Sequence, residues 1–357
     1  MNILDKIKRR IWGKIVFTFK DKKIYPYIYR SYWHYLIYNN NHTDISTCYY
    51  AALPNPGAGI GHQMANWIAG LWYSRLFNLQ FAHLPFSTSQ WEEFLGFGVG
   101  EKTVKELKKR GYKTCKLPLF HEDNPKEIEL NLKIISSYAG KKVVFIAEQD
   151  QFYRDQYGVM DILKQKFYHA PSRKNDHLIY SSENFNIAIH VRRGDIMVDP
   201  NNPNLVMRYL SNDYFEKVLK QVIKNIQTSK PIHIYFFSQG KPEDYPEFTK
   251  YPNLHWCLNM NAQDSFLHFV YADLLITSKS SFSYKPALLN NGIKVCPRNF
   301  WHGYPNSYNP QIQISAESET KRSIFREKDK TKRSKKESAQ HSKSRNKSFV
   351  MTSVSAL

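Results

Sequence analysis

Hydrophobic residues recur along this chain with two alternating periods, one typical of strands and the other of helices. In the first half, the pattern predicts a strand over 48–53, a loop with three glycines, a helix over 64–76 and a strand over 79–84. The predicted helix carries its apolar residues at helical spacing: Met64, Trp67, Ile68, Leu71, Trp72 and Leu76. A strand, a glycine loop, a helix and a strand in this order begin a parallel α/β sheet.

The rest of the chain continues this alternation and predicts a second Rossmann-like domain. Further strands are expected over 142–147, 186–191, 232–237 and 274–277, and further helices over 102–111, 213–226, 265–271 and 284–289. A polar break over 171–177 separates the two halves. We therefore divide the chain into an N-terminal extension over 1–46, one α/β domain over 47–175, a second over 176–315 and a tail over 316–357.

Charge is concentrated at the two ends of the chain. The formal net charge is +20, and the tail carries 12 basic and 5 acidic residues, whereas residues 1–23 carry 8 and 2. The tail is rich in Ser, Lys, Arg and Glu without hydrophobic periodicity, so we expect it to be disordered. A protein that binds nucleic acid through its folded body would interleave basic and aromatic residues there. Nucleic-acid binding through the basic tail is the alternative from a different functional class.

The N-terminal extension combines basic residues with apolar ones. Between Lys6 and Lys23 it holds Trp12, Ile15, Val16, Phe17 and Phe19. This composition suits either peripheral contact with an anionic membrane face or an ordinary basic helix packed on its own domain. Its apolar stretch is too short to span a bilayer, and no secretory signal is recognisable. We expect a cytoplasmic protein, either free or peripheral on the cytoplasmic membrane face.

Cysteine spacing agrees with that location. The four cysteines are widely separated and form neither a CxxC pair nor a Cys/His cluster with metal spacing: Cys48, Cys115, Cys257 and Cys296. We expect buried or partly buried free thiols in a reducing compartment, and no metal site.

Charged and hydroxyl side chains follow each strand of the second half. They are His190, Arg192, Arg193 and Asp195 after the first strand, Ser238 and Gln239 after the second, and Ser280 and Ser281 after the third. The carboxyl ends of neighbouring parallel strands lie on one rim, where open α/β sheets bind ligands. Guanidinium groups grip phosphate oxygens bidentately, and hydroxyl and loop N–H groups complete such a cradle. The sequence therefore predicts a diphosphate site on this rim.

Several residues near this rim have two possible roles. His190 either contacts phosphate or is a buried hydrogen-bonding residue, and Asp195 either orients an arginine or caps the next segment. Asp199 either faces the same cleft or belongs to a turn. His62 is either a catalytic base or an ordinary loop histidine.

The glycine loop of the first half carries Gly57, Gly59 and Gly61. It matches neither the dinucleotide-binding fingerprint nor the phosphate-binding loop of nucleoside triphosphatases. Its position between a strand and a helix predicts a loop that faces a ligand.

Three stretches resemble the superfamily of α-1,2-, α-1,6- and protein O-fucosyltransferases. His190-Val-Arg-Arg-Gly-Asp195 resembles its HxRRxD signature. The loop over 57–63, followed by an aromatic-rich helix, resembles its GxGNQ opening, with His62 in place of the usual Asn. The stretch over 272–283 resembles its third motif, and the order agrees from about Ala51 to about Phe300.

The resemblance implies a GT-B fold, in which two Rossmann-like domains face a cleft. It implies GDP-fucose as the donor, held by the domain over 176–315, with the acceptor on the domain over 47–175 and with no metal or other cofactor. By analogy, Arg192 binds the β-phosphate, Ser281 binds the diphosphate and Asp264 reads the guanine edge. His190 and Asp195 would support the arginines.

The reaction implied is inverting transfer of fucose to a hydroxyl of a glycan or a lipid-linked glycan, of α-1,2 type. The base is His62, Asp199 or the donor phosphate itself. The alternative of the same class is a transferase that uses another nucleotide sugar.

Overall fold

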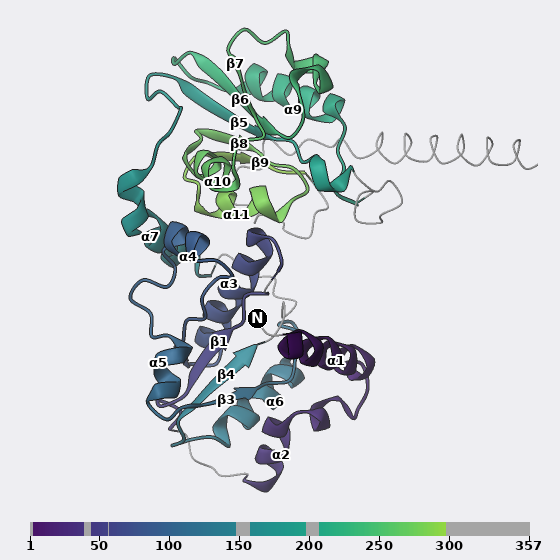
Figure 1. Cartoon of the computed structure of the whole chain (residues 1–357), viewed down its shortest axis with the longest axis vertical. Coiled ribbons are helices and arrows are strands. Elements are labelled where there is room, and N and C mark those ends of the chain that lie inside the picture. The colour runs from purple at the N-terminus through teal and green to yellow at the C-terminus, as the bar shows by residue number, and fades with distance from the viewer. Residues whose placement is uncertain (1–2, 39–43, 56, 148–157, 198–206, 298–357) are drawn as a thin grey trace, which may run out of the picture.

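The computed structural model describes residues 3–38, 44–55, 57–147, 158–197 and 207–297. These residues form two α/β units, the first lower and the second upper in Figure 1. Each unit has one parallel sheet with helices on both faces. The predicted disordered tail over 316–357 and the site candidate Asp199 lie outside the described residues.

The first sheet has the strand order β2-β1-β4-β3, and all its pairings are parallel. The strands are β1 (Tyr49–Ala52), β2 (Gln80–Phe81), β3 (Lys113–Lys116) and β4 (Val143–Ala147). The helices that precede, link and follow them are α1 (Ile3–Phe19), η1 (Tyr25–Ile28), α2 (Arg30–Ile37), α3 (Ile60–Leu76), α4 (Ser89–Leu95), α5 (Val104–Lys109), α6 (Pro125–Ser136), α7 (Met160–Tyr168) and η2 (Pro171–Asn175).

Side chains alternate between the faces of this sheet, as strand geometry requires. Tyr50 and Phe145 join the core that α3 and α6 cover. Tyr49 and Val144 join a smaller core under α5. The sheet is thus the middle of three layers.

The second sheet has the order β7-β6-β5-β8-β9, also parallel throughout. Its elements are β5 (Phe185–His190), η3 (Gly194–Ile196), α9 (Asn212–Asn225), β6 (Ile232–Ser238), η4 (Pro242–Asp244), η5 (Pro246–Phe248), β7 (Leu254–Leu258), α10 (Ala262–Tyr271), β8 (Leu274–Ile276), α11 (Ser281–Leu289) and β9 (Ile293–Val295). Helix α9 covers one face, and α10 and α11 cover the other. This strand order is that of a Rossmann-like domain.

One apolar core joins the two units. It contains Trp67 of α3, Leu163 and Phe167 of α7, Phe266 of α10 and Leu288 of α11, all at most 2% exposed. Lys164 of α7 also donates to Asn291 Oδ1 at 2.8 Å, so α7 is fastened to the second unit although it precedes the predicted boundary at residue 175. The cleft between the units therefore has walls fixed by a shared core.

Two other expectations can be compared with the fold. All four cysteines are free thiols, as predicted, with Cys48 and Cys257 buried. Among the described residues, no helix is both long enough and apolar enough to cross a membrane.

Candidate functional site

A cleft of about 530 Å³ lies between the N-terminus of α3 and the carboxyl edge of the second sheet. This volume lies in the ordinary range of ligand pockets. The cleft is centred on the ends of β5 and β8, with β6 on the other side of β5. The chain reverses its direction of strand addition at β5, which is the position where open α/β sheets bind ligands. Two Rossmann-like domains facing such a cleft form the expected GT-B arrangement.

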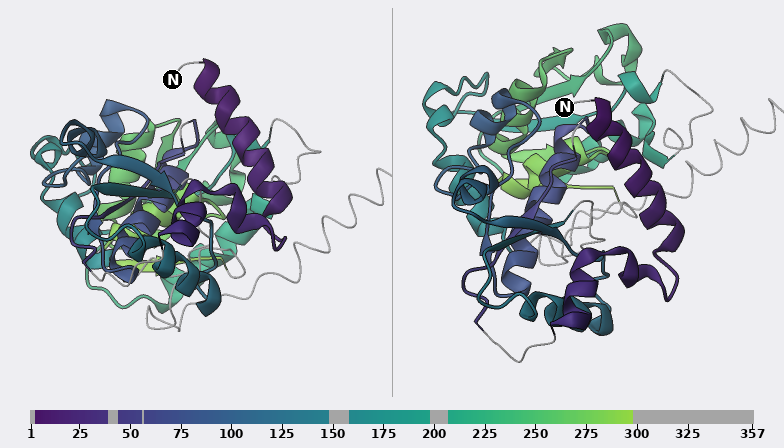
Figure 2. Two further views of the ribbon diagram at one scale, coloured as in Figure 1. Left: turned by 90° about the horizontal axis from the view of Figure 1, so that it is seen from below. Right: turned by 60° about the horizontal axis from the view of Figure 1, so that its bottom comes forward.

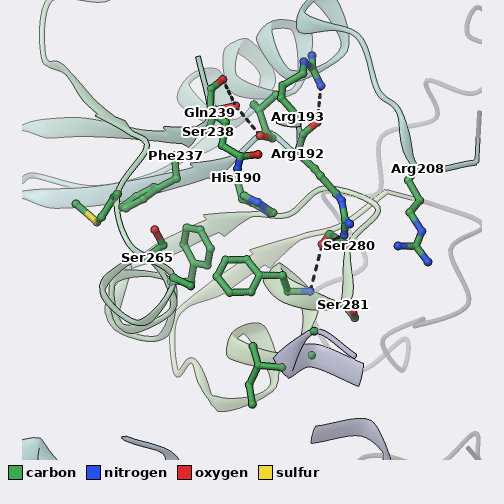
Figure 3. A pocket seen from close by; sticks show the side chains of 18 of the residues that line it. His190, Arg192, Arg193, Arg208, Phe237, Ser238, Gln239, Ser265, Ser280 and Ser281 are labelled. Carbon is green, nitrogen blue, oxygen red and sulfur yellow. Dashed lines mark hydrogen bonds between the residues drawn. The ribbon is translucent and has the colours of Figure 1, made fainter. Parts of the chain in front are cut away.

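Arg192 points from the end of β5 toward the N-terminus of α11 (Figure 3). Its Nη1 donates a hydrogen bond to Ser280 Oγ at 2.8 Å. Ser280 is the N-cap of α11, and its Oγ also accepts from the amide of Phe282 at 3.2 Å. A guanidinium group is thus held beside the positive end of a helix, and both favour an anion at this place.

Arg193 points the opposite way from Arg192 in Figure 3, although it also borders the cleft. Its Nη2 donates to Asn212 Oδ1 at 2.6 Å and its Nη1 donates to the carbonyl of Arg192 at 2.9 Å. The guanidinium lies over the ring of Tyr209, 4.8 Å from its centroid, and burial lowers the pKa of Arg193. Arg193 therefore fastens the start of α9, and the two arginines do not form a single grip.

Arg208 is a cleft residue that the sequence pattern did not single out. It lies three residues before Ser211, the N-cap of α9, and lines the cleft with Arg192. Figure 3 places its side chain on the same side of the cleft as the Arg192–Ser280 pair. The only signal in the sequence is a basic residue just before a helix cap, which is too common to be diagnostic.

His190 is a buried hydrogen-bonding residue at the cleft floor. Its Nδ1 is 2.9 Å from Ser278 Oγ, and its ring lies against the rings of Phe269 and Phe282. Burial lowers the pKa of His190 to about 3, and Arg192 adds to the effect. The imidazole is therefore neutral at physiological pH and adds no positive charge beside the arginine.

Gly194 follows the two arginines in a conformation that needs glycine. Its φ is +66°, and a Cβ there would lie 2.0 Å from Gln239 Oε1. Gln239, which follows β6, thus packs directly against the first residue of η3. Asp195 lies in η3.

The remaining predicted serines differ in how their hydroxyls are used. Ser238 Oγ donates to the carbonyl of Val191 at 2.7 Å and contacts Tyr245 Oη at 2.6 Å, so it ties two strand ends together. Ser281 lines the cleft, and its hydroxyl has no hydrogen bond to any other described residue. Of these two serines, only Ser281 has a hydroxyl group that is available to donate a hydrogen bond to a ligand.

Asp264 lies near the cleft but is not among its lining residues, whereas its neighbours Ala262 and Ser265 are. Its carboxylate accepts from the side-chain amide of Asn261, the N-cap of α10. The structure places this acid at the exposed start of α10, at the margin of the cleft.

The glycine loop forms the opposite wall. Gly57 has a φ of +87°, Gly59 is the N-cap of α3, and Gly61 follows in its first turn. A Cβ at Gly61 would lie 2.6 Å from the carbonyl carbon of Ser281, so the first turns of α3 and α11 meet backbone to backbone. His62 lines the same wall.

No cluster of three or more potential metal ligands occurs among the residues that the structure describes. The cleft presents the guanidinium groups of Arg192 and Arg208 and the N-termini of α3 and α11, all of which attract negative charge, whereas the Arg193 guanidinium at its border is bonded to Asn212.

No protein-family model matches the chain, and no curated protein matches its sequence. Three solved structures align with most of this chain at low sequence identity and with TM-scores below 0.5. POFUT1 in complex with GDP is 14% identical, with a TM-score of 0.45, over 71% of this chain and 99% of that one. NodZ α-1,6-fucosyltransferase of Bradyrhizobium, soaked with GDP-fucose, is 9% identical, with a TM-score of 0.42, over 71% and 97%. A mutant of Arabidopsis thaliana FUT1 in complex with GDP is 11% identical, with a TM-score of 0.38, over 77% and 76%.

The close contact at Gly61 predicts a specific sensitivity to substitution. Gly61→Ala places a methyl group 2.6 Å from the Ser281 backbone. We expect a loss of about 1–3 kcal/mol in the free energy of unfolding, the usual cost of overpacking, measured by urea denaturation. Gly59→Ser is the matched control, because a Cβ there meets nothing within 4 Å and serine is a good N-cap. An equal loss in both variants would contradict the contact.

The buried imidazole predicts a pH dependence of stability. The pKa of His190 is about 3 in the folded chain and about 6.5 when unfolded, so the unfolded state binds the extra proton between these values. Stability is therefore lost as the pH falls through this window, by at most about 1.4 kcal/mol per pH unit. Urea denaturation from pH 7 to pH 5 should show a steeper decline for the wild type than for His190→Asn, and identical declines would refute the assignment.

Proposed function

We propose that the cleft binds the diphosphate of GDP-fucose and that the protein transfers the fucose, with inversion, to a glycan hydroxyl. The observation that supports this most directly is the Arg192 guanidinium held by Ser280 at the N-terminus of α11. It faces the N-terminus of α3 across the cleft, and Arg208 adds a second guanidinium. The motif resemblance at 190–195 supports GDP-fucose over other nucleotide sugars.

The proposed chemistry depends on stabilising a leaving diphosphate. The acceptor oxygen attacks the anomeric carbon as the bond from that carbon to the β-phosphate oxygen breaks, and the bonding electrons stay on the phosphate. Arg192, the free hydroxyl of Ser281 and the positive N-terminal end of α11 would stabilise this charge. Because they are held in place before the reaction, they need little reorganisation, which is the main source of such electrostatic stabilisation.

The proton of the acceptor hydroxyl needs a base. His62 lies on the wall opposite Arg192 and is one candidate. Asp199, outside the described residues, and the donor phosphate are the others. His190 is less suited, because its low pKa makes it a very weak base.

The guanine would lie toward α10. Ser265, Met260 and Phe269 line that end of the cleft, and Asp264 at its margin is the candidate for the guanine edge. The acceptor would enter beside the glycine loop. An α-1,2 linkage, a glycan or lipid-linked glycan acceptor, a cytoplasmic location and independence of metal ions complete the proposal.

Donor binding gives the first test. Arg192→Ala should weaken GDP binding by about a hundredfold in isothermal titration calorimetry, because a charge-assisted contact to the diphosphate is lost. Arg208→Ala should also weaken it. Arg110→Ala, at an exposed position in the first unit, is the matched control and should bind GDP as the wild type does. Unchanged affinity in Arg192→Ala would remove the central support for the proposal.

The reaction gives the second test. Mass spectrometry of glycan acceptors incubated with GDP-fucose should detect an added deoxyhexose, and the yield should persist in EDTA. Parallel incubations with other GDP-, UDP- and CMP-sugars distinguish the alternative transferase, which would use one of them in place of GDP-fucose. A chain without residues 316–357 should retain GDP binding. If nucleic-acid binding instead proves to be the only activity, and is lost with the tail, the alternative class is correct.

A further inference from the structure

Helix α1 has one apolar face packed on the protein. Val16 is buried with Tyr25 and Tyr29 in a small separate core. Trp12 makes an edge contact with Tyr29 at 5.4 Å between centroids, and Lys116 Nζ lies 4.5 Å from the Trp12 ring centroid. Three of the apolar residues predicted to suit a membrane, Trp12, Val16 and Phe19, therefore pack within the chain.

A second apolar stripe on α1 has no such cover. Leu4, Ile7 and Ile11 are 60%, 50% and 54% exposed. Their spacing of three and four residues places them in one row along the helix. Lys8 and Lys14 are exposed on either side of this row. A helix with one face packed on its domain would ordinarily present only polar residues on the other.

The exposed apolar residues of the protein gather in this region. Of the seventeen large apolar residues that are exposed among those described, ten lie between residues 4 and 38. The same segment has nine basic and two acidic residues. After α1, Lys20 and Lys22 lie over the rings of Phe17 and Phe19, at 5.1 and 5.4 Å. Exposed apolar and aromatic side chains thus occur together with basic ones in the first 38 residues.

We propose that α1 lies on an anionic membrane surface, with Leu4, Ile7 and Ile11 inserted at the level of the headgroups. The flanking lysines would contact lipid phosphates, and their aliphatic stems would cover the edges of the stripe. A second copy of the chain is a poorer occupant, because a symmetric contact would bring Lys8 and Lys14 against the same basic surface. The basic flanks instead complement the negative surface potential of an anionic leaflet.

The attachment of α1 to the first unit determines where the cleft would lie relative to the membrane. Arg9 Nη2 donates to Asn55 Oδ1 at 3.1 Å. Asn55 belongs to the loop between β1 and α3, and the next part of that loop lines the cleft. Figure 2 shows α1 along the margin of the molecule. Membrane binding would therefore hold the glycine-loop side of the cleft near the lipid. This orientation suits a lipid-linked acceptor. The inference about the acceptor rests on the proposed function, whereas the inference of lipid binding does not.

The test is co-sedimentation of the full chain with vesicles of phosphatidylglycerol and phosphatidylcholine, or of phosphatidylcholine alone. We expect binding to the anionic vesicles that weakens with salt, and little binding to the neutral ones. The triple variant Leu4→Glu, Ile7→Glu, Ile11→Glu should lose more than about tenfold in partitioning, because the inserted apolar area is replaced by negative charge.

The matched control places three glutamates on exposed apolar residues elsewhere, at Val99, Leu132 and Ile179, and should bind vesicles as the wild type does. Both triple variants should bind GDP like the wild type, so a failure here is separate from a failure of the proposed function. Equal vesicle binding by the α1 variant and the wild type would overturn the proposal, and the basic tail would then carry the binding. Self-association that the α1 variant abolishes, without vesicle binding by the wild type, would identify a second copy as the occupant.

Discussion

The contact between Gly61 and the Ser281 backbone is the constraint on which the arrangement of the two units depends. It brings the first turns of α3 and α11 together, and each turn presents amide groups that no helical carbonyl can satisfy. Two positive helix ends at such short range repel one another, and Arg192 adds a full charge beside them. The apolar core shared by α3, α7, α10 and α11 holds these groups together. The stability of that core is therefore what maintains a preformed anion site.

Much of the fold could be predicted because its central strands are buried on both faces. β4, β5 and β6 appear in the sequence as short apolar runs, and α9 as a strongly periodic helix. The elements missed are edge strands or lie outside the strongest periodicity. β3 is the sequence Lys-Thr-Cys-Lys, largely exposed, and β9 contains Lys294. Their partners in the sheet, rather than their own residues, make them strands.

The sequence predicted where the candidate site lies, but not the direction in which each side chain points. Strand ends could be located from the hydrophobic pattern, so Arg192, Ser280 and Ser281 were correctly brought to one rim. The direction of each side chain depends on its neighbours. Arg193 turns away because Asn212 and Tyr209 hold it, and these contacts join segments that the sequence pattern cannot place together. Arg208 lines the cleft from the segment just before α9, a position that the hydrophobic pattern does not reveal.

The position of α7 has a consequence for how the chain is made. Leu163 and Phe167 are synthesised with the first unit. The helices α10 and α11, which help to cover these two side chains, are synthesised later. Until then, the nascent first unit carries an exposed apolar patch that its own sheet does not cover. Such patches are the usual binding sites of chaperones and the usual starting points of aggregation. The dependence of the fold on a shared core thus makes the second half of the protein an intramolecular partner for the completion of the first.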